Sequence, residues 1–145
     1  MNSEFDESGK LQYPDPIALS CPRCGALGAL KVGQLNFRGK LRWFESASCD
    51  TCGLRSEADG VGLPPSKIRE LLIESDGEWR VVMSEVKSKA SAVKVLQSAL
   101  SLDMKAAVAL LRTEAKTVFL GTKSESLWLA ELLEAAGERP ILTRV

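Results

Sequence analysis

The sequence predicts an α+β protein built in two parts: a small antiparallel sheet held by cysteines, then a β-α-α-β-α-β domain. All four cysteines lie in the first half, in two Cys-x-x-Cys pairs. A moderately alternating segment interrupted by glycines separates the pairs. From Trp79 onward, short apolar strands alternate with stretches of helical periodicity. We expect the second domain to form a three-stranded antiparallel sheet against helices.

Residues 1–18 precede the first cysteine, are rich in acids and contain Pro14 and Pro16. This composition predicts a flexible acidic arm. Residues 1–10 contain no apolar run of the kind found in signal peptides. No stretch of the sequence approaches the roughly 20 apolar residues of a membrane span. We therefore expect a cytoplasmic protein with no membrane partner.

The cysteines are candidate ligands of one structural Zn²⁺ ion: Cys21, Cys24, Cys49 and Cys52. Two Cys-x-x-Cys turns aimed at one point supply four thiolates in a tetrahedron, which suits zinc. A glycine follows each pair and lets backbone N–H groups turn toward the sulfurs. Disulfides are disfavoured in a cytoplasmic chain, and a dithiol redox site normally has a single pair. An iron site with the same ligands is the remaining alternative.

Between the pairs, residues 30–45 are interrupted by Gly33 and Gly39, which predicts two strands and a turn. Residues 19–62 therefore resemble a zinc ribbon, in which two cysteine turns pin a small antiparallel sheet.

The same hairpin interleaves basic and aromatic side chains at Arg38, Lys40, Arg42 and Trp43. Such a hairpin can bind nucleic acid through phosphate contacts and base stacking. The alternative is that its aromatic residues fill the core of a small domain.

A loop rich in Gly and Pro at residues 60–65 leads into a connector over residues 63–78, with a helix predicted from Ser66 to Glu74. The domain at 79–145 is predicted to contain, in order, a strand at 79–83, helices at 89–100 and 104–112, a strand at 117–120, a helix from a Thr122 cap to Ala136, and a strand at 140–145.

This element order and several stretches resemble the C-terminal domain of the bacterial ribosomal stalk protein. The stretches are Val93–Leu96, Leu102–Ala107, Thr122–Glu125 and Leu129–Gly137. The resemblance implies the same fold for residues 79–145.

The stalk family presents a basic helical face to translation factors that hydrolyse GTP, and Lys94 and Lys105 stand where family lysines stand. Gln97 and Val108 replace basic residues of that face, and the family's N-terminal dimerisation region is absent. The resemblance therefore implies a reused fold with a reduced factor-binding surface.

Three side chains of the last helix, Leu127, Trp128 and Leu132, lie off its predicted buried stripe. A tryptophan beside two leucines needs a cover. That cover is either another part of this chain or a protein partner, for which tryptophan is a frequent binding hot spot.

No catalytic constellation is visible, since the sequence has no His, no Gly-rich phosphate loop and no clustered carboxylates. We therefore expect a non-catalytic, zinc-containing module that binds a specific protein partner, as inhibitors and immunity-type proteins do. The alternative is a nucleic-acid- or ribosome-associated factor that uses the basic-aromatic hairpin. Equal numbers of basic and acidic residues, 19 of each, disfavour this alternative.

Overall fold

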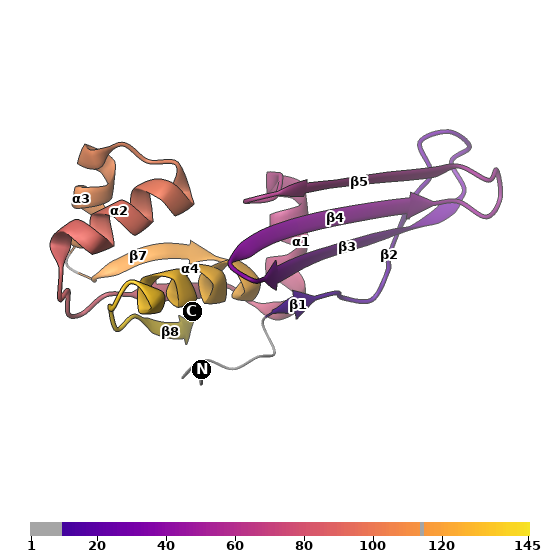
Figure 1. Ribbon diagram of the computed structural model, residues 1–145. Helices are drawn as coiled ribbons and strands as arrows, with labels where there is room; N and C mark the ends of the chain where they lie inside the picture. Colours follow the sequence, from indigo (N-terminus) through magenta and orange to yellow (C-terminus); the bar gives the residue numbers. More distant parts are fainter. Residues whose placement is uncertain (1–9, 114) are drawn as a thin grey trace.

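Alternating side chains between the two cysteine pairs build a long β-hairpin. The computed structural model describes residues 10–113 and 115–145 (Figure 1). The first sheet consists of β1 (Leu11–Gln12), β2 (Ile17–Ser20), β3 (Leu27–Phe37), β4 (Lys40–Ser48) and β5 (Arg55–Val61). All its pairs are antiparallel: β3 pairs with β1, β2 and β4, and β4 also pairs with β5.

This sheet is larger than the two-stranded ribbon that the sequence predicts, because the flanking segments add strands to both edges of the hairpin. The arm predicted over residues 1–18 is corrected in its described part, since Leu11–Gln12 and Ile17–Ser20 pair with β3. An uncovered strand edge offers a row of free backbone donors and acceptors, which these short strands satisfy. Residues 1–9 lie outside the described part of the chain.

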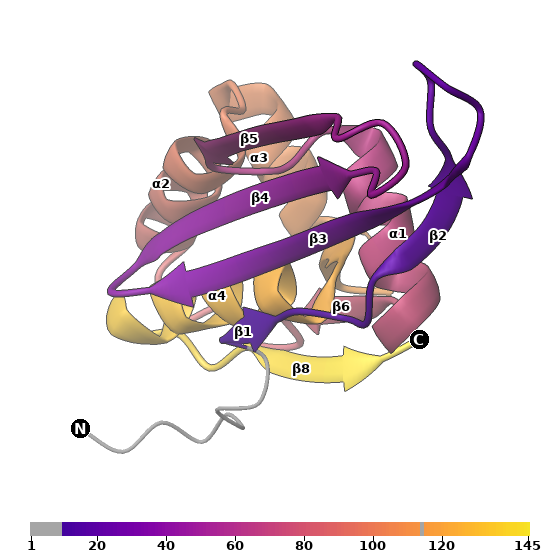
Figure 2. The same cartoon turned by 90° about the vertical axis from the view of Figure 1, so that its right-hand side faces the viewer.

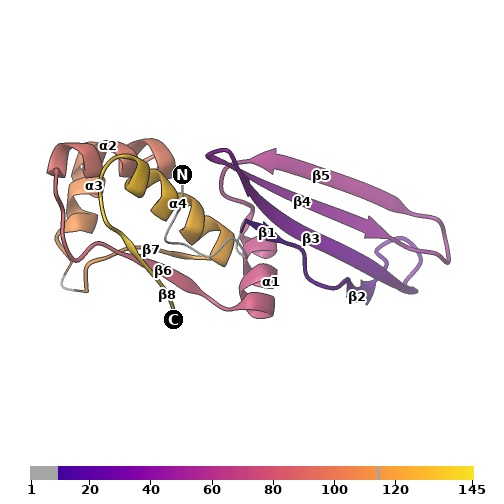
Figure 3. The same ribbon diagram turned by 60° about the horizontal axis from the view of Figure 1, so that its bottom comes forward.

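One face of the first sheet packs against α1 (Ser66–Asp76). Leu30 and Val32 of β3 form a buried cluster with Ile68 and Leu72 of the helix. The helix predicted as a connector thus contributes to the core of the first sheet, and it lies at the junction between the two halves (Figure 3).

The second half folds in the predicted order as β6 (Trp79–Val82), α2 (Lys89–Leu100), α3 (Met104–Leu111), β7 (Thr117–Gly121), α4 (Lys123–Ala135) and β8 (Ile141–Arg144). Its strands form an antiparallel sheet in the order β7-β6-β8. The helices begin at side-chain caps, with Ser88, Asp103 and Thr122 each accepting a backbone N–H bond. The predicted α+β class is confirmed.

A buried polar network joins the two halves where β3 meets the start of α4. The fully buried Glu125 accepts hydrogen bonds from Gln34 Nε2 at 2.7 Å and from Arg69 Nε at 2.8 Å. It also completes a capping box with Thr122, whose hydroxyl donates to Gln34 Oε1. One carboxylate therefore binds groups from β3, α1 and α4.

Two further amides extend this junction. Gln12 of β1 accepts from the Ser124 N–H at 2.8 Å and donates to Asp76 Oδ2 at 2.9 Å. Asn36 of β3 donates to Glu131 Oε1 at 2.9 Å. The side chains of the first sheet thus hold both neighbouring helices.

Replacing Glu125 with Ala leaves the Arg69 guanidinium and the Gln34 amide without their shared acceptor. Breaking a buried charge pair costs about 3–5 kcal/mol. Because Arg69 is 30% exposed and keeps access to water, we expect E125A to lower the free energy of unfolding by the smaller figure, about 3 kcal/mol. Urea denaturation measures this loss.

Glu131→Ala is the matched control, because Glu131 also bonds across the junction but is 30% exposed. Its removal should cost about 1–2 kcal/mol, because the Asn36 amide, which is 4% exposed, loses one hydrogen bond. Equal losses in the two variants would contradict a special role for Glu125.

Candidate functional site

The four cysteines belong to the loops between β2 and β3 and between β4 and β5, which lie at the end of the first sheet away from α4 (Figure 1). All four Sγ atoms lie within 4.8 Å of one another. The Cys21 and Cys52 sulfurs are 3.7 Å apart, and those of Cys24 and Cys49 are 3.6 Å apart. A tetrahedral site with metal–sulfur bonds of about 2.3 Å has edges of about 3.8 Å. The predicted cysteines are therefore placed to hold one metal ion.

The two cysteine turns have the same backbone geometry. The Gly25 N–H donates to the Cys21 carbonyl, and the Gly53 N–H donates to the Cys49 carbonyl. Both glycines are left-handed, with φ of 77° and 78°, a conformation that disfavours side chains. Matching turns at the start of β3 and the end of β4 are what bring the two pairs face to face.

The pKa values of the Cys21, Cys24 and Cys49 thiols are shifted in different directions. The backbone N–H of Cys24 is the main cause that lowers the pKa of Cys21 to about 6, and the backbone N–H of Cys52 lowers the pKa of Cys49. The Ala26 N–H lowers the pKa of Cys24, but desolvation and the neighbouring sulfurs outweigh it and raise that pKa to about 12. Cysteine binds metal as the thiolate, and neighbouring thiolates repel one another. A divalent cation between the four sulfurs offsets that repulsion.

Strand alternation divides the predicted basic-aromatic hairpin between two faces. Trp43 pairs with Gln34 in the register and is half-buried against the cluster on α1. Lys40 and Arg42 are exposed on the opposite face, because successive strand residues point to opposite sides. Trp43 therefore cannot act with these cations on one surface. Arg38 lies in the turn, 5.1 Å above the Phe37 ring.

The apolar patch predicted on the last helix is covered by this chain. Leu127 is 1% exposed and Trp128 is 7% exposed. The Trp128 indole donates to the Gly39 carbonyl at 3.0 Å, so the hairpin turn of the first sheet closes over it. Internal packing thus accounts for Leu127 and for most of Trp128, whose remaining surface lines a groove between α2 and α4. Leu132 is only partly buried.

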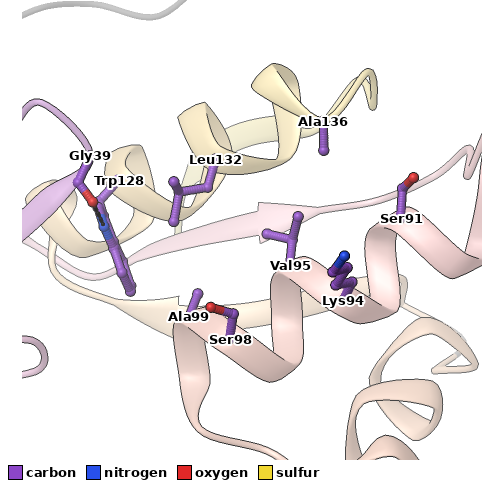
Figure 4. Close-up of a pocket in the computed structure, with 9 residues that line it drawn as sticks. All are labelled: Gly39, Ser91, Lys94, Val95, Ser98, Ala99, Trp128, Leu132 and Ala136. Atoms are coloured by element: carbon purple, nitrogen blue, oxygen red, sulfur yellow. Dashed lines mark hydrogen bonds between the residues drawn. The ribbon is translucent and has the colours of Figure 1, made fainter.

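Leu132 and Lys94 line a groove of about 490 Å³ between α2 and α4 (Figure 4). Val95 and Ala99 of α2 contribute apolar surface, and Lys94 adds an exposed cation. Lys105 is exposed on α3 and does not line this groove. The structure thus brings Lys94 together with Leu132 but separates it from Lys105.

The sequence reasoning missed Tyr13, whose ring centroid lies 5.5 Å from that of Phe44. Tyr13 falls within the arm predicted over residues 1–18, and Phe44 follows the predicted hairpin residue Trp43. Successive strand residues point to opposite faces of a sheet. This alternation is the signal in the sequence that places Arg42 and Phe44 on one face and Trp43 on the other.

No protein-family model matches the sequence, and no match is found among curated proteins or among solved structures. The resemblance of residues 79–145 to the stalk domain therefore stands on residue pattern and element order alone. Over the described ranges, no helix has the length and apolar character needed to cross a membrane.

We expect the purified protein to contain one metal ion per chain, measured by elemental mass spectrometry. Cys49→Ser should lose that ion and destabilise the first sheet, because metal binding and folding are coupled in such sites. Ser48→Ala, at the neighbouring position, should keep it. A folded chain with reduced thiols that takes up no metal from solution would contradict the site.

Proposed function

We propose that the bound ion is Zn²⁺ and that it is structural. Four sulfur ligands at tetrahedral spacing suit zinc, and they leave no open position for water or substrate. The ion ties the turn before β3 to the turn after β4, so its binding energy stabilises the first sheet.

We further propose that the chain is a non-catalytic module that binds a protein partner in the groove between α2 and α4. The observation that carries this proposal is the groove itself, which combines an apolar floor with one exposed cation at Lys94 (Figure 4). The sequence contains no His, the commonest general base. Proteins that act through a surface, such as inhibitors and immunity-type proteins, are the class that this arrangement fits.

The groove suits an amphipathic, acidic helix of the partner. Its walls are two helices, and a groove between helices is a recurring seat for the apolar face of a third. Val95, Ala99 and Leu132 would contact the partner's apolar side chains, and Lys94 would face a carboxylate. The resemblance to the stalk domain agrees with a lysine used for protein contact at this position.

Affinity capture from lysate of the native cells, at moderate salt, with and without nuclease treatment, tests this proposal. We expect one stoichiometric protein, identified by mass spectrometry, to remain bound to the native chain. Lys94→Glu should weaken its binding at least tenfold, equivalent to about 1.4 kcal/mol. Ser98→Trp, which fills the groove from an exposed position of α2, should have the same effect.

Lys105→Glu is the control, because it makes the same charge change on α3, outside the groove. A partner that binds all three variants as it binds the native chain would rule out the groove. A partner that disappears with nuclease would contradict direct protein binding.

A further inference from the structure

Among residues 10–113 and 115–145, no helix covers the outer face of the first sheet. Figure 2 shows β3, β4 and β5 in front and the labelled helices behind them. Leu30 and Val32 point toward α1, so the residues that alternate with them point away from it. Leu11, Tyr13 and Phe37 are each more than half exposed. We call this surface the outer face; it carries Leu11, Tyr13, Lys31, Leu35, Phe37, Lys40, Arg42 and Phe44.

The register sets these side chains in rows, because directly opposed residues share a face. Phe44 stands opposite Gly33, and a Cβ at that glycine would overlap the Phe44 ring. The ring therefore lies across the bare backbone of β3, where Tyr13 contacts it at an interplanar angle of 37°. The next row on the outer face pairs Leu35 with Arg42.

The following row pairs Phe37 with Lys40. Gly33 and Phe37 are four residues apart on β3, which separates the two aromatic positions by about 13 Å along the strand. Arg42 lies between them. The outer face thus carries Phe44, Arg42 and Lys40 in successive rows of β4, with Phe37 of β3 beside Lys40.

The cations of this face are available. Within the described residues, none of Lys31, Lys40 and Arg42 forms an ion pair, and all three are exposed. The acids of the same face, Glu57 and Asp59, lie on β5 at the edge of the sheet. Positive charge is therefore concentrated over β3 and β4, although the whole chain is neutral.

We propose that the outer face binds single-stranded nucleic acid along β3 and β4. Bases would stack on the Tyr13–Phe44 pair and on Phe37, while phosphates would contact Lys31, Lys40 and Arg42. Stacking on aromatic rings tolerates every base, so the expected binding depends little on sequence. A duplex keeps its bases stacked inside and offers only phosphates to this surface. The proposal is independent of the groove between α2 and α4.

Fluorescence anisotropy with labelled single strands of oligo-dT and oligo-U, each of about 12 nucleotides, tests the proposal against a duplex of equal length. We expect the single strands to bind more tightly than the duplex, and their affinity to fall steeply with salt. Tyr13→Ala should weaken single-strand binding about tenfold, whereas Tyr13→Phe should bind like the native chain.

Arg42→Gln should reduce the slope of log affinity against log salt by about 1, and Lys105→Gln on α3 should leave the slope unchanged. Phe44→Leu keeps apolar packing on Gly33 but removes the ring, and should match Tyr13→Ala. If Phe44→Leu fails to fold by circular dichroism, Tyr13→Ala decides the question, because Tyr13 is 52% exposed.

Three results would overturn the proposal. The first is an affinity for duplex equal to that for single strands, with no effect of Tyr13→Ala, since phosphate attraction alone explains it. The second is no binding of either single strand by the metal-loaded chain at low salt. The third is self-association in sedimentation that Tyr13→Ala abolishes, because a second copy then occupies the outer face.

Discussion

Glu125 is fully buried and pairs with Arg69, and its hydrogen-bond donors come from separate parts of the chain. Gln34 reaches it from β3, Arg69 from α1, and the Thr122 N–H from the start of its own helix. A buried carboxylate is tolerated only when hydrogen bonds and an opposite charge replace the water it has lost. The sheet and both helices must therefore hold one arrangement for this group to be satisfied. Among the described residues, no buried side-chain polar atom lacks a partner.

That arrangement brings the hairpin of the first sheet into the core of the second half. Leu41 of β4 belongs to the same buried cluster as Val81 of β6 and Leu129 of α4. The Gly39 carbonyl beside it accepts the Trp128 indole N–H. Trp128, which lies off the predicted buried stripe of α4, is thus covered by the hairpin and is only 7% exposed.

Local sequence patterns predicted the features that depend on residues close together in the chain. Periodicity and caps located α2, α3 and α4, and the spacing of the cysteines located their cluster. The capping box at Thr122 and Glu125 was also visible. Its long-range partners were not, because Gln34 is 91 residues from Glu125 and Arg69 is 56 residues away. Pairing of Leu11–Gln12 and Ile17–Ser20 with β3 was equally invisible, since short edge strands have little periodicity of their own.

The hairpin of β3 and β4 is fixed at both of its ends. At one end the cysteine cluster joins the turn before β3 to the turn after β4. At the other end Gln34 and Gly39 are bonded to α4 residues and the α4 cap. The outer-face side chains of β3 and β4 lie between these two anchors, so their spacing is set before any ligand arrives. A surface ordered in advance binds without the entropy cost of arranging flexible side chains and strands. The metal ion would then assist binding by keeping one end of the outer face rigid. The buried Glu125 carboxylate would do the same at the other end.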